Sequence, residues 1–475
     1  MMDEIDRKIL SSTSSLLTGL VQSGVLEGHK AVEAKLAVGA LNFALARDDY
    51  EPARIERLRL HEDRLSAEFA LLFGEHTQSE REHPQLSRWG DQAGEELASV
   101  VARLSGGALS RQDDENLVAR RLHEFLISLY EPVIPDVAAG SRAVYGRVEV
   151  AARPEPTSTF ITGEGLQRYM RARFPDAQEL QVTKLEIVQG GYSKATYIAD
   201  LKTRSREHKL VIRQDRPGLP TGSSVVQEFA VLREIYSADV PVPKPLWVEE
   251  DMTHFGAAVM AVEFCPGVPG RELPVDPKRQ MSWTLSFAEV LAKLHVIPGI
   301  PALDVRDVVR FEIETMSKRF AAMKRLPYPG VEFGIAWLLN HIEDLAGRPV
   351  CRTHGDLAFH NVLINEDKIR AALDWEFTHF CDPAEDLAYI KKFIDEFGLW
   401  NEFVRHYKQH GGFDMDEKSC RYFAVFNNVK ISVGIAGLLN AGLLPDMEDI
   451  KLINTGVTNL PRFEIDVINS IIHGS

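Results

Sequence analysis

The spacing of hydrophobic positions changes along the chain and separates it into two regions. In the first region apolar residues recur every three or four positions, as at Leu122, Phe125 and Leu129, and this spacing predicts helices. In the second region short apolar runs of strand length alternate with turns and with further helical patterns. Between the two regions, residues 149–160 contain two prolines among small polar residues, a composition typical of a linker.

The second region is expected to begin with strands and to continue with helices. Strands are predicted at 180–188, 194–201, 209–213 and 257–264, and helices at 163–174, 225–236, 282–294, 311–323 and 335–345. The pattern therefore predicts an α+β chain with three parts. They are an all-helical domain over 1–148, a small β-rich lobe over 161–265 and a helical lobe over 266–475.

The composition is that of a globular protein and narrows the range of partners. The 475 residues carry a formal charge of −15, with 45% apolar and 26% charged residues. This acidic balance argues against nucleic-acid or anionic-membrane partners, because both need a basic surface. The four cysteines have no metal-like spacing, the N-terminus has no signal-peptide pattern, and no uninterrupted apolar run reaches membrane-spanning length. We therefore expect a cytoplasmic protein with reduced thiols.

Three oxygen-bearing side chains follow one another at a spacing that predicts phosphoryl transfer. Asp356 precedes Asn361 by five positions, and Asp374 follows after two short apolar runs. If these runs form a hairpin, Asn361 and Asp374 lie at the same end of it and both reach one hard cation. Phosphoryl transfer needs a carboxylate that accepts the proton of the attacking hydroxyl, and oxygen ligands for the magnesium ions on the triphosphate. The set makes the chain a candidate ATP-dependent kinase.

The upstream strands contain candidates for nucleotide binding. The loop between the first two predicted strands consists of Gly190, Gly191, Tyr192 and Ser193. Its glycines either bring backbone N–H groups to phosphates or serve only as a hairpin turn. Arg213 ends the third strand, where a kinase places a cation on the phosphates, and Glu228 is its expected partner unless it lies on a solvated helix face. Glu263 and Cys265, on either side of Phe264, are expected to meet adenine through their backbone groups.

Two histidines flank the proposed catalytic carboxylate. In the layout of a kinase catalytic loop, a histidine at the position of His354 is expected to pack and form hydrogen bonds beside the loop, and this is favoured over a role as general base. The role of His360 is left open by the sequence.

Taken together, these motifs resemble those of the aminoglycoside phosphotransferase and choline-kinase-like superfamily. The resemblance covers about residues 160–475 and includes Asp374-Trp375-Glu376 and the run 382–388. It implies a two-lobed protein-kinase-like fold that uses ATP and Mg²⁺. It also implies Asp356 as the catalytic base, Asn361 and Asp374 as magnesium ligands, and Asp386 as a support of the catalytic loop.

Within this superfamily, Val211–Arg213 and the loop 190–193 resemble a bacterial branch linked to acyl-CoA dehydrogenases. Some members of that branch phosphorylate the hydroxyl of 4-hydroxyacyl-CoA thioesters. Residues 34–41 and 104–107 are similar to a small helical protein that is a separate partner of such kinases. The resemblance implies a small-molecule kinase with a fused partner-like domain, a hydroxyacyl-CoA acceptor and a functional link to an acyl-CoA dehydrogenase.

Three other functions stay open at the level of sequence. An antibiotic O-phosphotransferase, for example one acting on aminoglycosides, would use the same catalytic residues. A catalytically silent nucleotide-binding scaffold is expected to lack Asp356, Asn361 or Asp374, and all three are present. A protein kinase is expected to carry an Asp-Phe-Gly metal motif where this chain has Asp374-Trp375-Glu376.

Overall fold

A computed structural model describes most of the second region of the chain. The described residues are 161–174, 178–188, 194–204, 206–216, 223–273, 276–297, 303–323, 328–442 and 450–474, with a few positions between 116 and 127. The chain forms two compact units. We call Ala152–Val305 with Gly347–Met415 the sheet unit, and Met1–Ala151 with Arg306–Ala346 and Asp416–Ser475 the helical unit.

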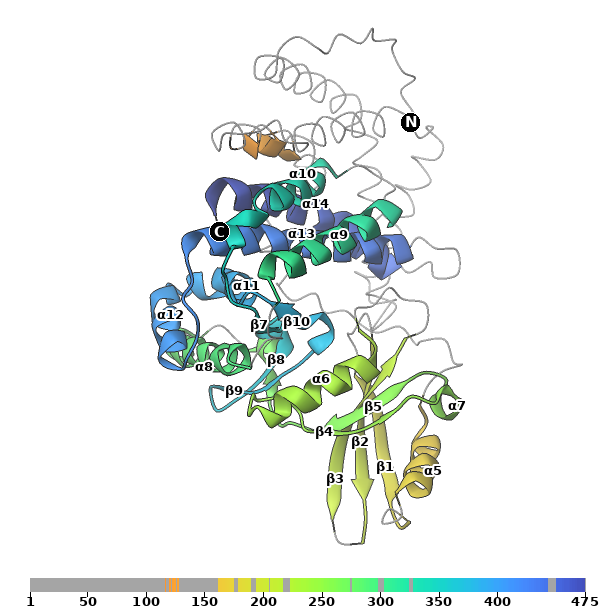
Figure 1. The fold of residues 1–475 in the computed structure, drawn as a ribbon. Coiled ribbons are helices and arrows are strands. Elements are labelled where there is room, and N and C mark those ends of the chain that lie inside the picture. The colour runs from red at the N-terminus through yellow and green to blue at the C-terminus, as the bar shows by residue number, and fades with distance from the viewer. Residues whose placement is uncertain are drawn as a thin grey trace, which may run out of the picture. The chain divides into compact units, whose positions relative to one another are not determined.

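The sheet unit begins with an antiparallel five-stranded sheet and the helices that pack on it (Figure 1). In sheet order the strands are β1 (Gln181–Val188), β2 (Lys194–Lys202), β3 (Glu207–Asp215), β5 (Val259–Glu263) and β4 (Pro245–Glu249). The helices are α5 (Gly163–Arg173), α6 (Val225–Ser237) and the short α7 (Met252–Phe255). Helix α5 packs on β1, and α6 packs on β4 and β5. The boundary of α6 is fixed by a capping box between Ser224 and Gln227.

One hydrophobic core holds this sheet to helix α5. Alternate residues of β2 are buried, and Tyr197 and Ala199 of that strand pack with Leu166 of α5, Ile212 of β3 and Trp247 of β4. Each large apolar side chain that is fully buried stabilises the fold by roughly 1.5–3 kcal/mol. The core occupies one face of the sheet. Charged residues of β2 and β3 that point to the other face can therefore form a polar site.

The sheet unit continues with two small sheets and several helices. The first sheet contains β6 (Val268–Pro269), β8 (Val362–Asn365) and β9 (Lys368–Ala372), and the second pairs β7 (Cys351–Thr353) with β10 (His379–Cys381). The helices are η3 (Gly270–Glu272), α8 (Pro277–His295), η5 (Phe359–Asn361), η6 (Trp375–Phe377), α11 (Ala384–Asp395) and α12 (Trp400–Gln409). Strands β8 and β9 are joined by Glu366 and Asp367, which both have positive φ, as a two-residue hairpin turn requires.

The helical unit contributes α9 (Val305–Met323), of which Val305 belongs to the sheet unit, together with α10 (Pro329–Asn340), η4 (Ile342–Leu345), α13 (Glu417–Gly442) and α14 (Ile450–His473). Helix α13 is long and apolar enough to cross a membrane, with a mean hydropathy of 1.4. However, 56% of its apolar window is buried within the protein, and it packs against α10 and α14. This packing is that of a core helix.

The predicted fold class is confirmed: a β-rich part is followed by helices around a β8–β9 hairpin. The expected helix 335–345 instead runs from Pro329 to Asn340 and is followed by the short η4. The strands β4, β6 and β10 were not predicted. The expected lobe 266–475 contributes to both compact units. The expected linker 149–160 and most of the expected domain 1–148 lie outside the described residues, although the described positions between 116 and 127 are helical.

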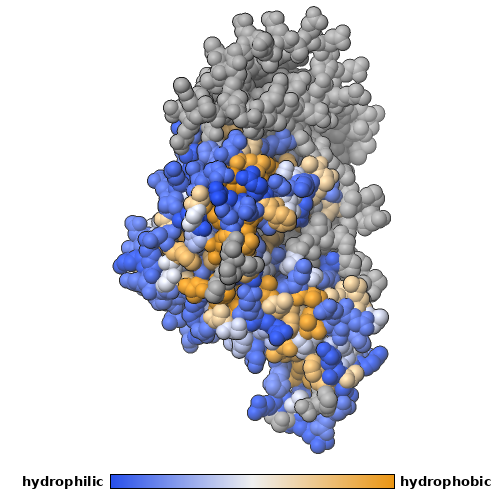
Figure 2. All heavy atoms as spheres, viewed as in Figure 1, coloured by the Kyte–Doolittle hydropathy of each residue, from blue (hydrophilic) through white to orange (hydrophobic). Residues whose placement is uncertain are grey.

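The visible surface in Figure 2 is largely hydrophilic over the sheet tips and over α12. Hydrophobic residues gather elsewhere on this face, and the most exposed of the large ones in the described chain are Phe311 and Met252. On α12 itself Arg405, Lys408 and Gln409 are exposed, whereas Phe403 and Tyr407 are buried.

Two glycines offer a matched test of how tightly the loop after β7 is packed. Gly355 and Gly347 both have φ between 76° and 79°, but a Cβ at Gly355 would lie 2.7 Å from the carbonyl oxygen of Phe377, whereas a Cβ at Gly347 meets no atom within 4 Å. We expect Gly347→Ala to lower the unfolding free energy by about 1 kcal/mol, the cost of the left-handed backbone. Gly355→Ala should lower it by about 2–4 kcal/mol because the clash adds to that cost. Urea denaturation of both variants checks this, and equal losses would contradict it.

Candidate active site

The loop between β7 and η5 is held by one buried carboxylate. Asp386, near the start of α11, accepts hydrogen bonds from the backbone N–H groups of His354 and Gly355, both at 2.8 Å. Its side chain is fully buried and also contacts His295 Nε2 at 3.1 Å. The other ring nitrogen of His295 lies 2.7 Å from the hydroxyl of Tyr407. The expected support of the loop by Asp386 is therefore present.

Asp356 lies in this loop with two polar neighbours. Asn361 Nδ2 donates to Asp356 Oδ2 at 2.9 Å and to its backbone oxygen at 3.0 Å, and His360 Nε2 lies 3.4 Å from the carboxylate. Burial by itself raises the pKa of Asp356, but hydrogen bonds and charge from His360, with a hydrogen bond from Tyr389, outweigh it and lower that pKa overall. The carboxylate is thus ionised at neutral pH, and about a quarter of it is exposed.

His354 has a structural role in this arrangement. Its Nδ1 accepts a hydrogen bond from the backbone N–H of Asp356 at 3.3 Å, and its Nε2 lies 2.9 Å from the carbonyl oxygen of Leu373. Burial lowers the pKa of His354, which keeps the ring neutral with its proton on Nε2. Both ring nitrogens therefore bond to the backbone. This is the hydrogen-bonding role that the sequence favoured over a role as general base.

Asp374 follows β9, at the same end of the hairpin as Asn361. The backbone N–H of Leu373, the residue before Asp374, donates to the carbonyl oxygen of Asn361 at 2.8 Å. This bond holds the two ends of the hairpin together. Asp374 has φ of 64°, a left-handed conformation that is uncommon outside glycine and frequent at functional positions. The hairpin geometry that the sequence predicted for these two residues is present.

Arg213 connects the sheet to this hairpin through two ion pairs. Its Nη1 donates to Glu228 Oε1 on α6 at 2.6 Å, and its Nη2 donates to Asp374 Oδ1 at 2.9 Å. Arg213 is 15% exposed and Glu228 is fully buried. Burial opposes the charge of Arg213, but Glu228 and Asp374 outweigh it and raise the pKa of the guanidinium. The expected pairing of Arg213 with Glu228 is present, and its second partner was not predicted.

Burial also sets the protonation of Glu228. It raises the pKa of this carboxyl to about 6, with Arg213 and Lys194 acting in the opposite direction and Asp374 and Glu376 adding to the rise. Glu228 is therefore ionised at neutral pH and takes up a proton in mildly acidic solution.

A second buried cation was missed by the sequence reasoning. Lys194, at the start of β2, is 2% exposed. Its Nζ donates to the carbonyl oxygen of Ser223 at 2.6 Å and lies 3.6 Å from both Asp215 and Glu376. The signal was available: Arg213 pairs directly with Thr196, and Lys194 is two positions away on the same face of β2.

The donor set fits a hard divalent cation. Asn361 turns its Nδ2 toward Asp356, which leaves its Oδ1 as the atom to bind a metal, and Asp374 uses only Oδ1 for Arg213 and is 35% exposed. Amide and carboxylate oxygens are the ligands that Mg²⁺ prefers. The residues present therefore fit the magnesium ion that the sequence predicted.

The remaining predicted residues lie apart from this cluster or outside the described residues. Gly190, Gly191, Tyr192 and Ser193 all lie outside the described residues. Glu263 ends β5, and Cys265 follows it. The backbone N–H of Glu263 donates to Lys244, and that of Phe264 donates to Lys209. These two donors are used within the protein, and the nucleotide-binding role of Glu263 and Cys265 stays a prediction.

Comparison with known proteins identifies a family for the part of the chain that carries this site. Residues 184–419 match the phosphotransferase enzyme family. Acyl-CoA dehydrogenase family member 10 of Mus musculus is 26% identical over 249 residues, which cover 50% of this chain and 23% of the mouse protein. Family member 11 of Rattus norvegicus is 26% identical over 252 residues, which cover 48% of this chain and 30% of the rat protein. The chain thus spans less than a third of the length of these relatives.

Among solved structures, a candidate aminoglycoside phosphotransferase of Ralstonia eutropha is 20% identical with a TM-score of 0.49 and covers 65% of this chain and 98% of its own. The match of residues 184–419 includes Arg213, Glu228, Asp356, Asn361 and Asp374. This part of the chain is a domain of the phosphotransferase enzyme family.

Proposed function

We propose that this chain transfers the γ-phosphoryl group of ATP to the hydroxyl of a small molecule. The observation that carries the proposal is the double ion pair of Arg213, which joins Glu228 and Asp374 at 2.6 and 2.9 Å in the family domain. A cation that pairs with a helix glutamate beside the metal-binding aspartate is the arrangement that phosphoryl transfer uses to position a triphosphate.

The residues of the chain divide the work of the reaction. Asp356 accepts the proton of the acceptor hydroxyl, and its lowered pKa keeps it ionised for that step. Asn361 and Asp374 would hold magnesium, which supplies neutralisation of the charge on the phosphates. Arg213 holds Asp374 through Oδ1, so Oδ2 is the atom that would bind the metal. After β5, the backbone of Cys265 is the group proposed to meet adenine, because the neighbouring N–H groups of Glu263 and Phe264 are already bonded within the protein.

For the acceptor we propose a hydroxyacyl-CoA thioester. The support is the matched relatives, which are named as acyl-CoA dehydrogenase family members. A kinase domain joined to such an enzyme in one chain suits a substrate that carries the same CoA carrier. A functional link between this chain and an acyl-CoA dehydrogenase is part of the same proposal.

The acceptor is tested by screening the purified chain for ADP release with each candidate. We expect turnover with 4-hydroxyacyl-CoA thioesters and none above background with a panel of aminoglycosides. Mass spectrometry of the product should show one added phosphoryl group on the acyl chain. Turnover with aminoglycosides alone would overturn the proposed acceptor but leave the proposed phosphotransfer intact. A lack of turnover with any hydroxylated acceptor would count against the proposed kinase activity itself.

Replacement of the catalytic carboxylate should separate turnover from binding. We expect Asp356→Asn to lower kcat by about 10²–10⁴-fold, the usual contribution of a positioned general base, with little change in ATP affinity. Steady-state kinetics and nucleotide titration measure both quantities. Asp395→Asn, which removes an exposed carboxylate of α11 paired with Lys391, is the matched control and should leave kcat unchanged. Near-normal kcat in the Asp356 variant would remove that residue from the mechanism.

The pKa of Glu228 predicts a change in activity in mildly acidic solution. As the pH rises through about 6, Glu228 loses its proton and completes its ion pair with Arg213, so kcat/KM should rise. The same ionisation acts on folding with the opposite sign. Because folding raises this pKa, the stability it contributes is present below the unfolded value of 4.5 and is lost as the pH passes about 6.

Glu228→Gln should abolish this rise and lower kcat/KM at neutral pH by about 10–100-fold, the worth of a hydrogen bond between charged groups. The control is Glu234→Gln, which removes another arginine ion pair from the same helix, that with Arg352. Retention of the pH dependence in the Glu228 variant would assign it to another group.

A further inference from the structure

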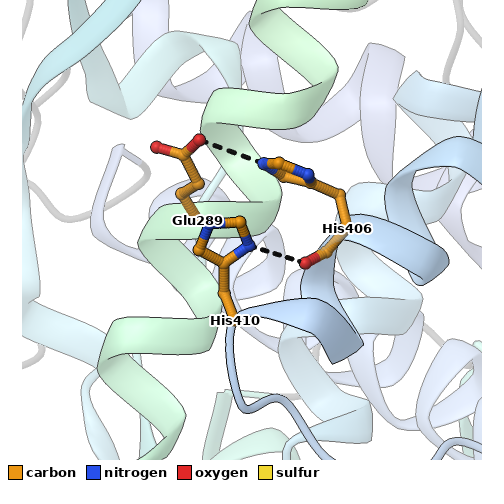
Figure 3. Close-up of side chains that lie close together, drawn as sticks. All are labelled: Glu289, His406 and His410. Atoms are coloured by element: carbon orange, nitrogen blue, oxygen red, sulfur yellow. Dashed lines mark hydrogen bonds and ion pairs between the residues drawn. The ribbon is translucent and has the colours of Figure 1, made fainter.

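Three potential metal ligands converge between two helices of the sheet unit (Figure 3). Glu289 lies on α8, His406 lies on α12, and His410 lies directly after α12. One ligand atom from each side chain lies within 4.8 Å of the other two. Nothing in the proposed phosphotransfer uses these residues.

The sequence places the two imidazoles together because they are four positions apart. Residues at this spacing lie on the same side of a helix, one turn apart, and the ring centroids of His406 and His410 are 4.2 Å apart. Phe403 and Tyr407, three positions before and one position after His406, lie on the adjoining part of the same side of α12 and are buried. Helix packing brings Glu289 to the imidazoles from 117 positions away in the chain.

A hydrogen bond already holds His410 in the orientation that a metal needs. His410 Nδ1 lies 2.9 Å from the carbonyl oxygen of His406, so it donates its proton there and leaves the lone pair on Nε2. Metal-binding histidines commonly donate their other N–H to a backbone carbonyl in this way. His406 Nε2 lies 3.0 Å from Glu289 Oε1. Ligand atoms around a tetrahedral zinc ion are separated by about 3.3 Å, so small shifts of the side chains complete the set.

We propose that Glu289, His406 and His410 bind a divalent transition-metal ion of the zinc class. Two imidazoles and one carboxylate form a donor set that zinc accepts, with water in the fourth position. Mg²⁺ prefers oxygen ligands and is better suited to the site formed by Asn361 and Asp374. The site is accessible, since Glu289 is 41% exposed and His410 is exposed.

The position of this site indicates a structural role. A bound ion joins α8 to α12, and the same two helices carry His295 and Tyr407, whose side chains meet at 2.7 Å. His295 contacts Asp386, which holds the backbone of the catalytic loop. The ion therefore clamps the helix pair that supports the loop, next to His295 and Tyr407 and away from the reacting groups.

The competing explanation is a simple surface ion pair between His406 and Glu289, with His410 as a bystander. The two explanations differ over His410, which is needed for the metal but not for the ion pair. His410→Ala is therefore the decisive variant. Because His410 is exposed, the variant should fold with the thermal midpoint of the metal-free wild type.

The test is a zinc titration of the chelator-treated full chain by calorimetry, in excess Mg²⁺ to fill oxygen-rich sites. We expect one zinc equivalent whose affinity falls at least tenfold in His410→Ala and in His406→Ala. Zinc should raise the thermal midpoint of the wild type by several degrees and that of these variants by less. His208→Ala, which removes an exposed histidine of β3, is the control and should bind zinc like the wild type.

A second cluster in the described chain, His379 with Cys381 and Glu385, supplies the comparison site. Loss of the zinc equivalent in His379→Ala but not in His410→Ala would move the metal there and overturn the proposal. Equal zinc affinity of the wild type and His410→Ala, or an absence of zinc binding to the wild type, would overturn it as well.

Discussion

The double ion pair of Arg213 is the interaction on which the site depends. One planar guanidinium joins strand β3, helix α6 through Glu228 and the end of the β8–β9 hairpin through Asp374. A fully buried carboxylate without a partner is expensive, and removing one partner of a buried pair typically costs 3–5 kcal/mol. The sheet, the helix and the hairpin are therefore held in one arrangement by a single side chain. An arginine suits this role because its forked donors address two carboxylates at once.

The charges around Arg213 also explain why the site suits a metal-bound triphosphate. Lys194 and Arg213 face Asp215, Glu228, Asp374 and Glu376, which is two positive against four negative groups and leaves a net charge of −2 at neutral pH. Free triphosphate would be repelled by this balance, whereas a complex with divalent cations brings the missing positive charge. The acidic character of the chain is thus compatible with the proposed nucleotide binding, because two local cations and a bound divalent metal would supply the positive charge that faces the phosphates.

The loop that carries Asp356 is held in place by a second buried network. Asp386 accepts hydrogen bonds from two consecutive backbone N–H groups, at His354 and Gly355, and its carboxylate contacts His295. The other ring nitrogen of His295 lies beside the hydroxyl of Tyr407. Buried polar networks that are fully hydrogen-bonded specify one geometry. Gly355 permits the left-handed turn that brings the loop against Phe377. The carboxylate of Asp356 is therefore presented by a fixed backbone, and its alignment does not depend on a long flexible side chain.

The kinds of element and the spacing of Asp356, Asn361 and Asp374 could be read from the amino-acid sequence. Hydrophobic period and turn residues are local properties, so the strands β1–β3, the hairpin β8–β9 and the helices α6 and α8 followed from them. Contacts between distant segments could not be read in this way: Asp374 pairs with Arg213, 161 positions away, and Glu289 meets His406 of α12 and His410 at its end. The strand β4, which begins at Pro245, and the three-residue β10 were likewise found only in the structure. Such contacts arise from packing between distant segments, where each side chain finds its partner only after the helices and sheets have met.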